Sequence, residues 1–179
     1  MIGWGWFYLS TVLDDFSRYI LAWKLCLTMT ATDVADTLTL ALRSSGLERV
    51  RVRHRPRLLS DSGPSYLSGQ LASRLSEHAM DHIRGKPYHP MTQGKIIERY
   101  HRSLKNQILL ENYYLPGQLE ARLAEFVDYY NNRRYHESLN NLTPADIYCG
   151  RGQTILNRRQ NIKHKTLELR RQLHHQAVA

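Results

Sequence analysis

The 179-residue chain has little cysteine and no long apolar run. Its two cysteines, Cys26 and Cys149, give neither a disulfide framework nor the spacing of a zinc-binding motif, and this scarcity fits a reducing, cytoplasmic setting. No stretch approaches the roughly 20 apolar residues that a membrane-spanning helix needs. Asp14 and Asp15 interrupt the apolar opening, which also lacks the basic region of a signal peptide. The sequence therefore predicts a globular intracellular protein.

Histidine is plentiful, but its spacing gives no metal site. Nine histidines are present, and neither the pair His78 and His82 nor the pair His174 and His175 forms a recognisable set with a cysteine. We therefore expect surface or core histidines and no zinc centre.

Acidic residues are outnumbered, since the formal net charge is +9 and the pI is about 9.8. The positive excess falls in three blocks, at residues 43–57, 82–110 and 151–179, which contain one acidic residue each: Glu48, Glu98 and Glu168. A polyanionic partner explains such clustering, and nucleic acid is the commonest one. The alternative is a solvated basic surface without a partner.

Hydrophobic periodicity predicts an α/β domain in which helices flank a mixed sheet. Strands are expected at 6–13, 19–25, 57–61 and 81–87. Helices are expected within 30–46, 66–79, 95–110 and 117–131, the first with Thr30 or Thr32 as its cap and Gly46 just beyond its end. Residues 153–175 are polar and weakly helical.

Two carboxylates stand out from this pattern. Asp61 follows a short strand, at the end where open α/β sheets place their sites, although a simple turn also explains an aspartate there. Glu98 opens an otherwise cationic helix and shares one face with Arg102 and Lys105. The adjoining face, expected to be buried, consists of Ile97, His101, Leu104 and Ile108. An ordinary salt pair between Glu98 and Arg102 is the alternative to a functional role.

Three segments in order carry a family resemblance: LLSDSGPSY at 58–66, PYHPMTQGKIIERYHRSLK at 87–105 and YYNNRRYHESLNNLTPADIY at 129–148. Together they resemble the catalytic core of bacterial insertion-sequence DDE transposases, which is of the retroviral-integrase type with an RNase H-like fold. The resemblance runs from about residue 4 to residue 151. It implies DNA strand cleavage and strand transfer in transposition, with self-association of the intact protein.

The resemblance also assigns residues. Members of the family bind two Mg²⁺ or Mn²⁺ ions through two aspartates and one glutamate, and carboxylate oxygens suit such hard cations. Asp61 resembles the second of these acids and Glu98 the third. The expected DNA-binding residues are Gln93, Lys95, Arg102 and Lys105. A further signature is expected to be mainly structural and comprises Tyr129, Asn131, Arg133, Arg134 and His136.

The chain departs from the family pattern in two ways. The family's leading aspartate lies on a central strand that precedes the one at 6–13, so we expect residues 1–150 to be an N-terminally truncated core and 151–179 a basic arm. Asp14 and Asp15 are expected to be turn residues steadied by Ser17 and Arg18 rather than substitutes. The 62–97 interval is also one residue longer than usual, which could turn Glu98 away from Asp61.

Three functional hypotheses follow. The first is a metal-dependent transposase core, here an incomplete copy that is inactive by itself because of a late start or gene decay. The second is a catalytically dead remnant that still binds DNA through its basic blocks. The third, a different RNase H-like nuclease, is disfavoured by the segment at 129–148.

Overall fold

The computed structural model describes residues 3, 5–50, 52–85 and 95–178, without the side chains of Lys95 and Val178. The chain forms two compact units, Met1–Tyr129 and Tyr130–Ala179. The sequence predicts a different division, into a catalytic core at 1–150 and a basic arm at 151–179. Compactness alone does not test that division, which stays a prediction.

The first unit begins with an antiparallel hairpin of β1 (Tyr8–Leu13) and β2 (Ile20–Cys26). In its turn, the Asp14 carboxylate accepts hydrogen bonds from the backbone N–H (2.8 Å) and the hydroxyl of Ser17. The Arg18 guanidinium pairs with Asp15 at 3.1 Å. Asp14 and Asp15 are therefore turn residues, as predicted.

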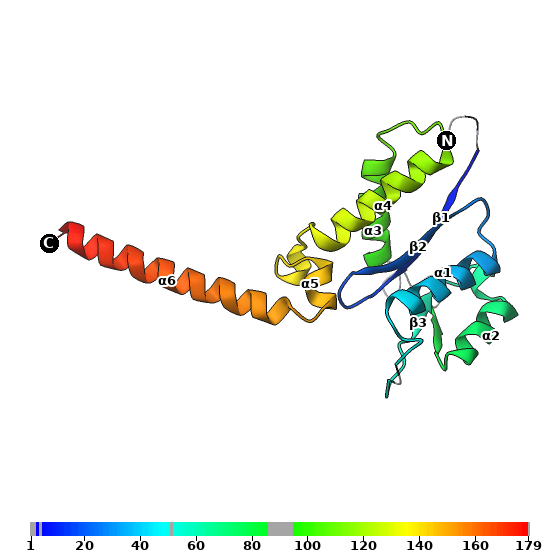
Figure 1. The fold of residues 1–179 in the computed structure, drawn as a ribbon, viewed down its shortest axis with the longest axis horizontal. Coiled ribbons are helices and arrows are strands. Elements are labelled where there is room, and N and C mark those ends of the chain that lie inside the picture. The colour runs from blue at the N-terminus through cyan, green and yellow to red at the C-terminus, as the bar shows by residue number, and fades with distance from the viewer. Residues whose placement is uncertain (1–2, 4, 51, 86–94, 179) are drawn as a thin grey trace. The chain divides into compact units, whose positions relative to one another are not determined.

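Helix α1 (Ala31–Ser44) packs on this hairpin (Figure 1). Thr30 is its N-cap, in a capping box with Asp33. The chain leaves the helix through Gly46, whose φ of +73° is left-handed backbone that glycine adopts without strain. The polar cap and the glycine thus set both ends of α1 where the sequence predicts them.

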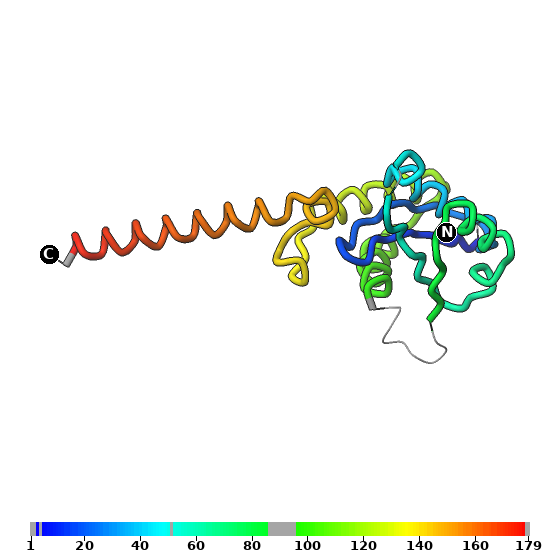
Figure 2. Tube along the Cα trace, turned by 90° about the horizontal axis from the view of Figure 1, so that it is seen from below, coloured from blue at the N-terminus to red at the C-terminus, as the bar shows by residue number. Residues whose placement is uncertain are grey.

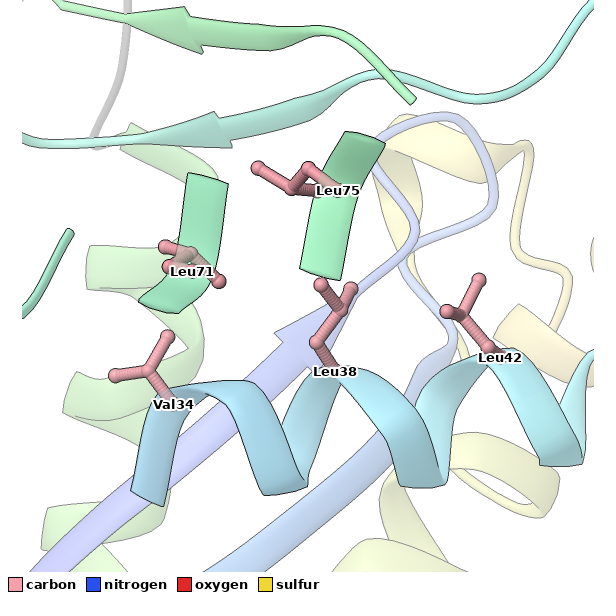
Figure 3. Packing of buried hydrophobic residues seen from close by; sticks show 5 residues of the cluster. All are labelled: Val34, Leu38, Leu42, Leu71 and Leu75. Carbon is pink, nitrogen blue, oxygen red and sulfur yellow. The ribbon is translucent and has the colours of Figure 1, made fainter. Parts of the chain in front are cut away.

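A second pair of strands, β3 (Leu58–Ser60) and β4 (His82–Arg84), is parallel and is joined by the short helix η1 (Pro64–Tyr66) and α2 (Gly69–Glu77). Figure 3 shows three apolar residues of α1 facing Leu71 and Leu75 of α2. These α1 residues are Val34, Leu38 and Leu42, and the five side chains form a buried cluster. This cluster ties the β3–α2–β4 unit to α1.

The strands of the described residues form two separate sheets, β1–β2 and β3–β4. Strands β1 and β3 each have one hydrogen-bonded neighbour there.

Helix α3 (Lys95–Ile108) and helix α4 (Pro116–Asn132) up to Tyr129 complete the first unit, and the end of α4 from Tyr130 onward belongs to the second. The buried face of α3 contains Tyr100, Leu104 and Ile108, and the Tyr100 ring lies 6.1 Å from that of Phe126 on α4. The sequence predicted a buried face that included Ile97 and His101. Both are only partly buried, because Tyr100 takes the most enclosed position.

The second unit contains η2 (Glu137–Leu139), α5 (Pro144–Tyr148) and α6 (Gly152–Val178). Its beginning is a packed turn, in which the Tyr130 and His136 rings lie 4.9 Å apart and the Arg134 guanidinium lies 5.7 Å from the Tyr130 ring centre. Asn131 is buried. These contacts agree with a structural role for the signature at 129–136.

Helix α6 is a single continuous helix (Figure 2) and is longer than the weakly helical stretch predicted at 153–175. Within the described ranges, no helix combines the length and the apolar character that crossing a bilayer would require.

Candidate metal and DNA site

Asp61 lies immediately after β3 and is exposed. Its Oδ1 accepts a hydrogen bond from the Gly63 N–H at 2.9 Å, so the turn role is real. A Cβ added to Gly63 would lie 3.0 Å from this oxygen, so a larger residue there would displace the Asp61 carboxylate by a few tenths of an ångström. In the described part of the chain, Oδ2 accepts no hydrogen bond. The turn therefore occupies one carboxylate oxygen and leaves the other available to a ligand.

A hydrogen-bond chain fixes the backbone at Asp61. The Ser60 hydroxyl donates to the Asp61 carbonyl at 2.8 Å and lies 2.8 Å from Nε2 of His82 on β4. Because a hydroxyl has one proton to donate, His82 Nε2–H is the donor in the second contact. Burial, followed by the charge of Arg84, lowers the pKa of His82.

This link was missed at the level of sequence. A serine directly before the strand-end Asp61 was visible, and so was a histidine on the next predicted strand. What the sequence lacks is the parallel register, which pairs Leu58 with His82 and Ser60 with Arg84 and so makes the Ser60–His82 contact a diagonal one.

The charge of Asp61 also affects its surroundings. Tyr66 packs against the α1–α2 cluster, and the pKa of its phenol is raised, first by burial and then by the negative charge of Asp61. A cation bound at Asp61 would offset that charge, so Tyr66 lies where it would sense binding.

Glu98 lies in the first turn of α3, where the helix dipole favours a negative charge. Glu98, Arg102 and Lys105 are all exposed, which agrees with the predicted shared face. Among the ion pairs between described residues there is none between Glu98 and Arg102. The structure therefore gives no support to the salt-pair alternative, and the Glu98 carboxylate is open to a ligand.

The remaining predicted site residues are less fully seen. Gln93 lies outside the described residues, and Lys95 is described only as the first backbone position of α3. In the residues that the structure describes, no group of three or more histidine, cysteine, aspartate or glutamate side chains could hold a metal. Asp61 and Glu98 have the oxygen donors that Mg²⁺ prefers, and Mg²⁺ often binds through one or two carboxylates with several waters.

Comparison with family models decides the kinship. Residues 1–90 and residues 78–144 match two models, both described as an integrase core domain. The chain belongs to the integrase core domain family.

Curated relatives of this integrase core are bacterial transposases. The chain is 30% identical over 156 residues to the transposase for insertion sequence element IS629 of Shigella sonnei, covering 79% of this chain and 46% of the relative. It is 26% identical over 148 residues to the transposase InsF for insertion sequence IS3A of Escherichia coli K12, covering 80% and 48%. The chain thus spans about half the length of these relatives, and the resemblance to insertion-sequence transposases is confirmed.

Solved structures confirm the RNase H-like fold. The catalytic core domain of BIV integrase is 23% identical with a TM-score of 0.58, and the match covers 83% of this chain and 89% of that one. The HTLV-2 integrase catalytic core in complex with magnesium (trimeric form) is 17% identical with a TM-score of 0.61, covering 79% and 84%. At these identities the likeness concerns the fold alone.

Proposed function

We propose that this chain is the core of a DDE-type transposase that cuts and joins DNA strands in the bacterial cytoplasm. One observation carries the proposal. In an integrase core, Asp61 follows a strand and its Oδ2 accepts no hydrogen bond from a described residue, and Glu98 lies on an exposed cationic helix face without a described ion-pair partner. An intact form is proposed to act as a homo-oligomer on transposon ends and target DNA.

Asp61 and Glu98 are proposed to hold Mg²⁺ or Mn²⁺. When bound, such ions activate the attacking oxygen and stabilise the leaving oxygen of an in-line displacement. The surrounding residues of the chain position the two carboxylates. The Ser60–His82 link holds the Asp61 backbone, and burial of Tyr100 on the opposite side of α3 turns Glu98 outward.

DNA is proposed to bind along the exposed face of α3. Arg102 and Lys105 lie one and two turns beyond Glu98 and form no ion pair with a described carboxylate. Cations in this position can hold phosphates and so set the register of the DNA on the protein. Gln93 and Lys95, which precede Glu98, are proposed to contact the same strand.

We further propose that a third carboxylate is needed for catalysis. The absence of a three-ligand group among described residues supports this, as does the use of Asp14 and Asp15 in a turn. The resemblance places the family's leading aspartate on a strand between β1 and β3, and each of these strands has one hydrogen-bonded neighbour among the described residues. The second candidate is a DNA-binding protein without catalytic activity. It rests on the same observation, that no group of three metal-binding side chains is found among the described residues.

A strand-transfer assay separates the two candidates. The 179-residue chain is mixed with labelled duplex DNA and Mg²⁺, beside a fusion that adds a β-strand carrying one aspartate. We expect transfer from the fusion only, and its loss in Asp61→Asn and Glu98→Gln forms of the fusion. A fusion that binds DNA but never cuts it would instead support the binding protein.

A further inference from the structure

Helix α6 is an exposed structure that the proposed chemistry does not use. Every residue from Asn157 to Ala177 is exposed, so tertiary packing does not hold this part of the helix. Its first turns are anchored, since Arg159 donates hydrogen bonds to the carbonyl oxygens of Asn140 (3.3 Å) and Asn141 (2.9 Å) and lies over the Tyr135 ring. The rest is solvated on all sides in the described chain.

The charge of α6 is one-sided. Six basic residues and one acid, Glu168, lie in Gly152–Val178, so the helix has a net charge of +5 from 6 − 1. Among the described residues, Glu168 pairs with His164 alone, at 3.3 Å. Five cations have no ion-pair partner among the described residues: Arg158, Lys163, Lys165, Arg170 and Arg171.

These cations are arranged around a narrow apolar stripe. At 100° per residue, Ile162, Leu169 and Leu173 lie on one side of α6, and all three are exposed. Arg158 and Lys165 lie along one edge of the stripe. Lys163 and Arg170 lie along the other edge, seven residues or about 10 Å apart along the axis.

We propose that α6 is a DNA-binding arm that lies in the major groove of B-form duplex DNA, with one cationic row toward each phosphate backbone. A helix about 10–12 Å across fits the major groove, which is about 12 Å wide. A second copy of α6 is a poor partner for this apolar stripe. Its two rows of cations would lie against the same rows of the first copy, and like charges repel. Double-stranded RNA fits poorly too, since its major groove is deep and narrow.

This inference deepens the proposed function, because duplex DNA is the substrate class that the function names. It is nevertheless independent of the metal site, since phosphate contacts need no divalent ion. All binding is therefore measured in EDTA, with the full chain. If strand transfer is absent but DNA binding still depends on α6, only the proposed function fails. If strand transfer occurs but DNA binding does not depend on α6, only this inference fails.

The test compares two triple variants by fluorescence anisotropy on a labelled duplex of about two helical turns. One variant is Lys163→Gln, Lys165→Gln and Arg170→Gln, in which glutamine preserves helix propensity. The matched control is Arg18→Gln, Arg74→Gln and Arg122→Gln, which removes the same charge outside the three basic blocks, from cations that already pair with a carboxylate. Far-UV circular dichroism checks that both variants keep the helix content of the wild type.

The readout is the slope of log K against log salt. Three lost phosphate contacts reduce its magnitude by about 2.7 in the α6 variant. The ratio of wild-type to variant affinity then falls about 40-fold between 50 and 200 mM salt. We expect the control slope to change by less than about 1. The proposal is overturned if the salt slope changes equally in both variants, or if it does not change in the α6 variant. It is also overturned if duplex RNA binds as tightly as duplex DNA, or if no DNA binds. The last result would point to an acidic helical protein as the partner of α6.

Discussion

Tyr100 is the most buried residue of α3, the helix that carries Glu98. Its side chain has 0% exposure, and its ring lies 5.3 Å from that of His101 and 6.1 Å from that of Phe126, which is itself 1% exposed. Tyr100→Ala would leave a cavity between α3 and α4, and truncation of a buried aromatic residue costs about 3–5 kcal/mol. Since domains are stable by about 5–15 kcal/mol, the variant should be marginally folded.

Urea denaturation followed by far-UV circular dichroism measures this cost. Two variants serve as controls. Tyr100→Phe keeps the buried ring. Glu98→Gln changes an exposed side chain and should shift the free energy of unfolding by no more than about 0.5 kcal/mol. A loss below about 1 kcal/mol in Tyr100→Ala would refute the view that this ring anchors α3. A loss in Glu98→Gln as large as that in Tyr100→Ala would refute the claim that Glu98 is free for function.

Three further predictions concern stability. Asp33→Asn should lower the free energy of unfolding at pH 7 by about 1 kcal/mol. The hydrogen bond from the Thr30 backbone, above other causes, holds the pKa of Asp33 well below its usual range. This stability is therefore lost as the pH falls below about 4, and the difference between the urea midpoints of the wild type and Asp33→Asn should narrow. Burial lowers the pKa of His82, so the unfolded chain binds more protons and stability should fall below about pH 6.5; His82→Gln, compared at pH 8 and 5.5, should reduce that fall. Asn140 has a φ of 56°, so thermal unfolding should show Asn140→Val destabilised by about 1–2 kcal/mol and Asn140→Gly little changed.

Local signals made much of the fold predictable from sequence. The apolar period of α1, its Thr30 cap and Gly46 define one helix, and their effects act within a few residues. The Asp14–Arg18 turn was predictable for the same reason, because its hydrogen bonds span three residues. The position of Asp61 followed from a short apolar run that ends in turn residues.

Contacts between distant segments were not predictable in this way. The Ser60–His82 hydrogen bond spans 22 residues and depends on a parallel register that the sequence does not encode locally. The choice of Tyr100 as the most buried residue of α3 depends on Phe126 of α4. The length of α6 was underestimated because its apolar stripe is narrow and its cations lie on both sides of it.

The central claim is that Asp61 and Glu98 hold one divalent cation together. Electron paramagnetic resonance titration with Mn²⁺ tests it most directly, on the wild type, Asp61→Asn, Glu98→Gln and the double variant. If the two carboxylates share an ion, each single substitution weakens Mn²⁺ binding and the double variant loses much less than the sum of the two single losses. Fully additive losses, or a Glu98→Gln variant that binds Mn²⁺ as the wild type does, would contradict the account.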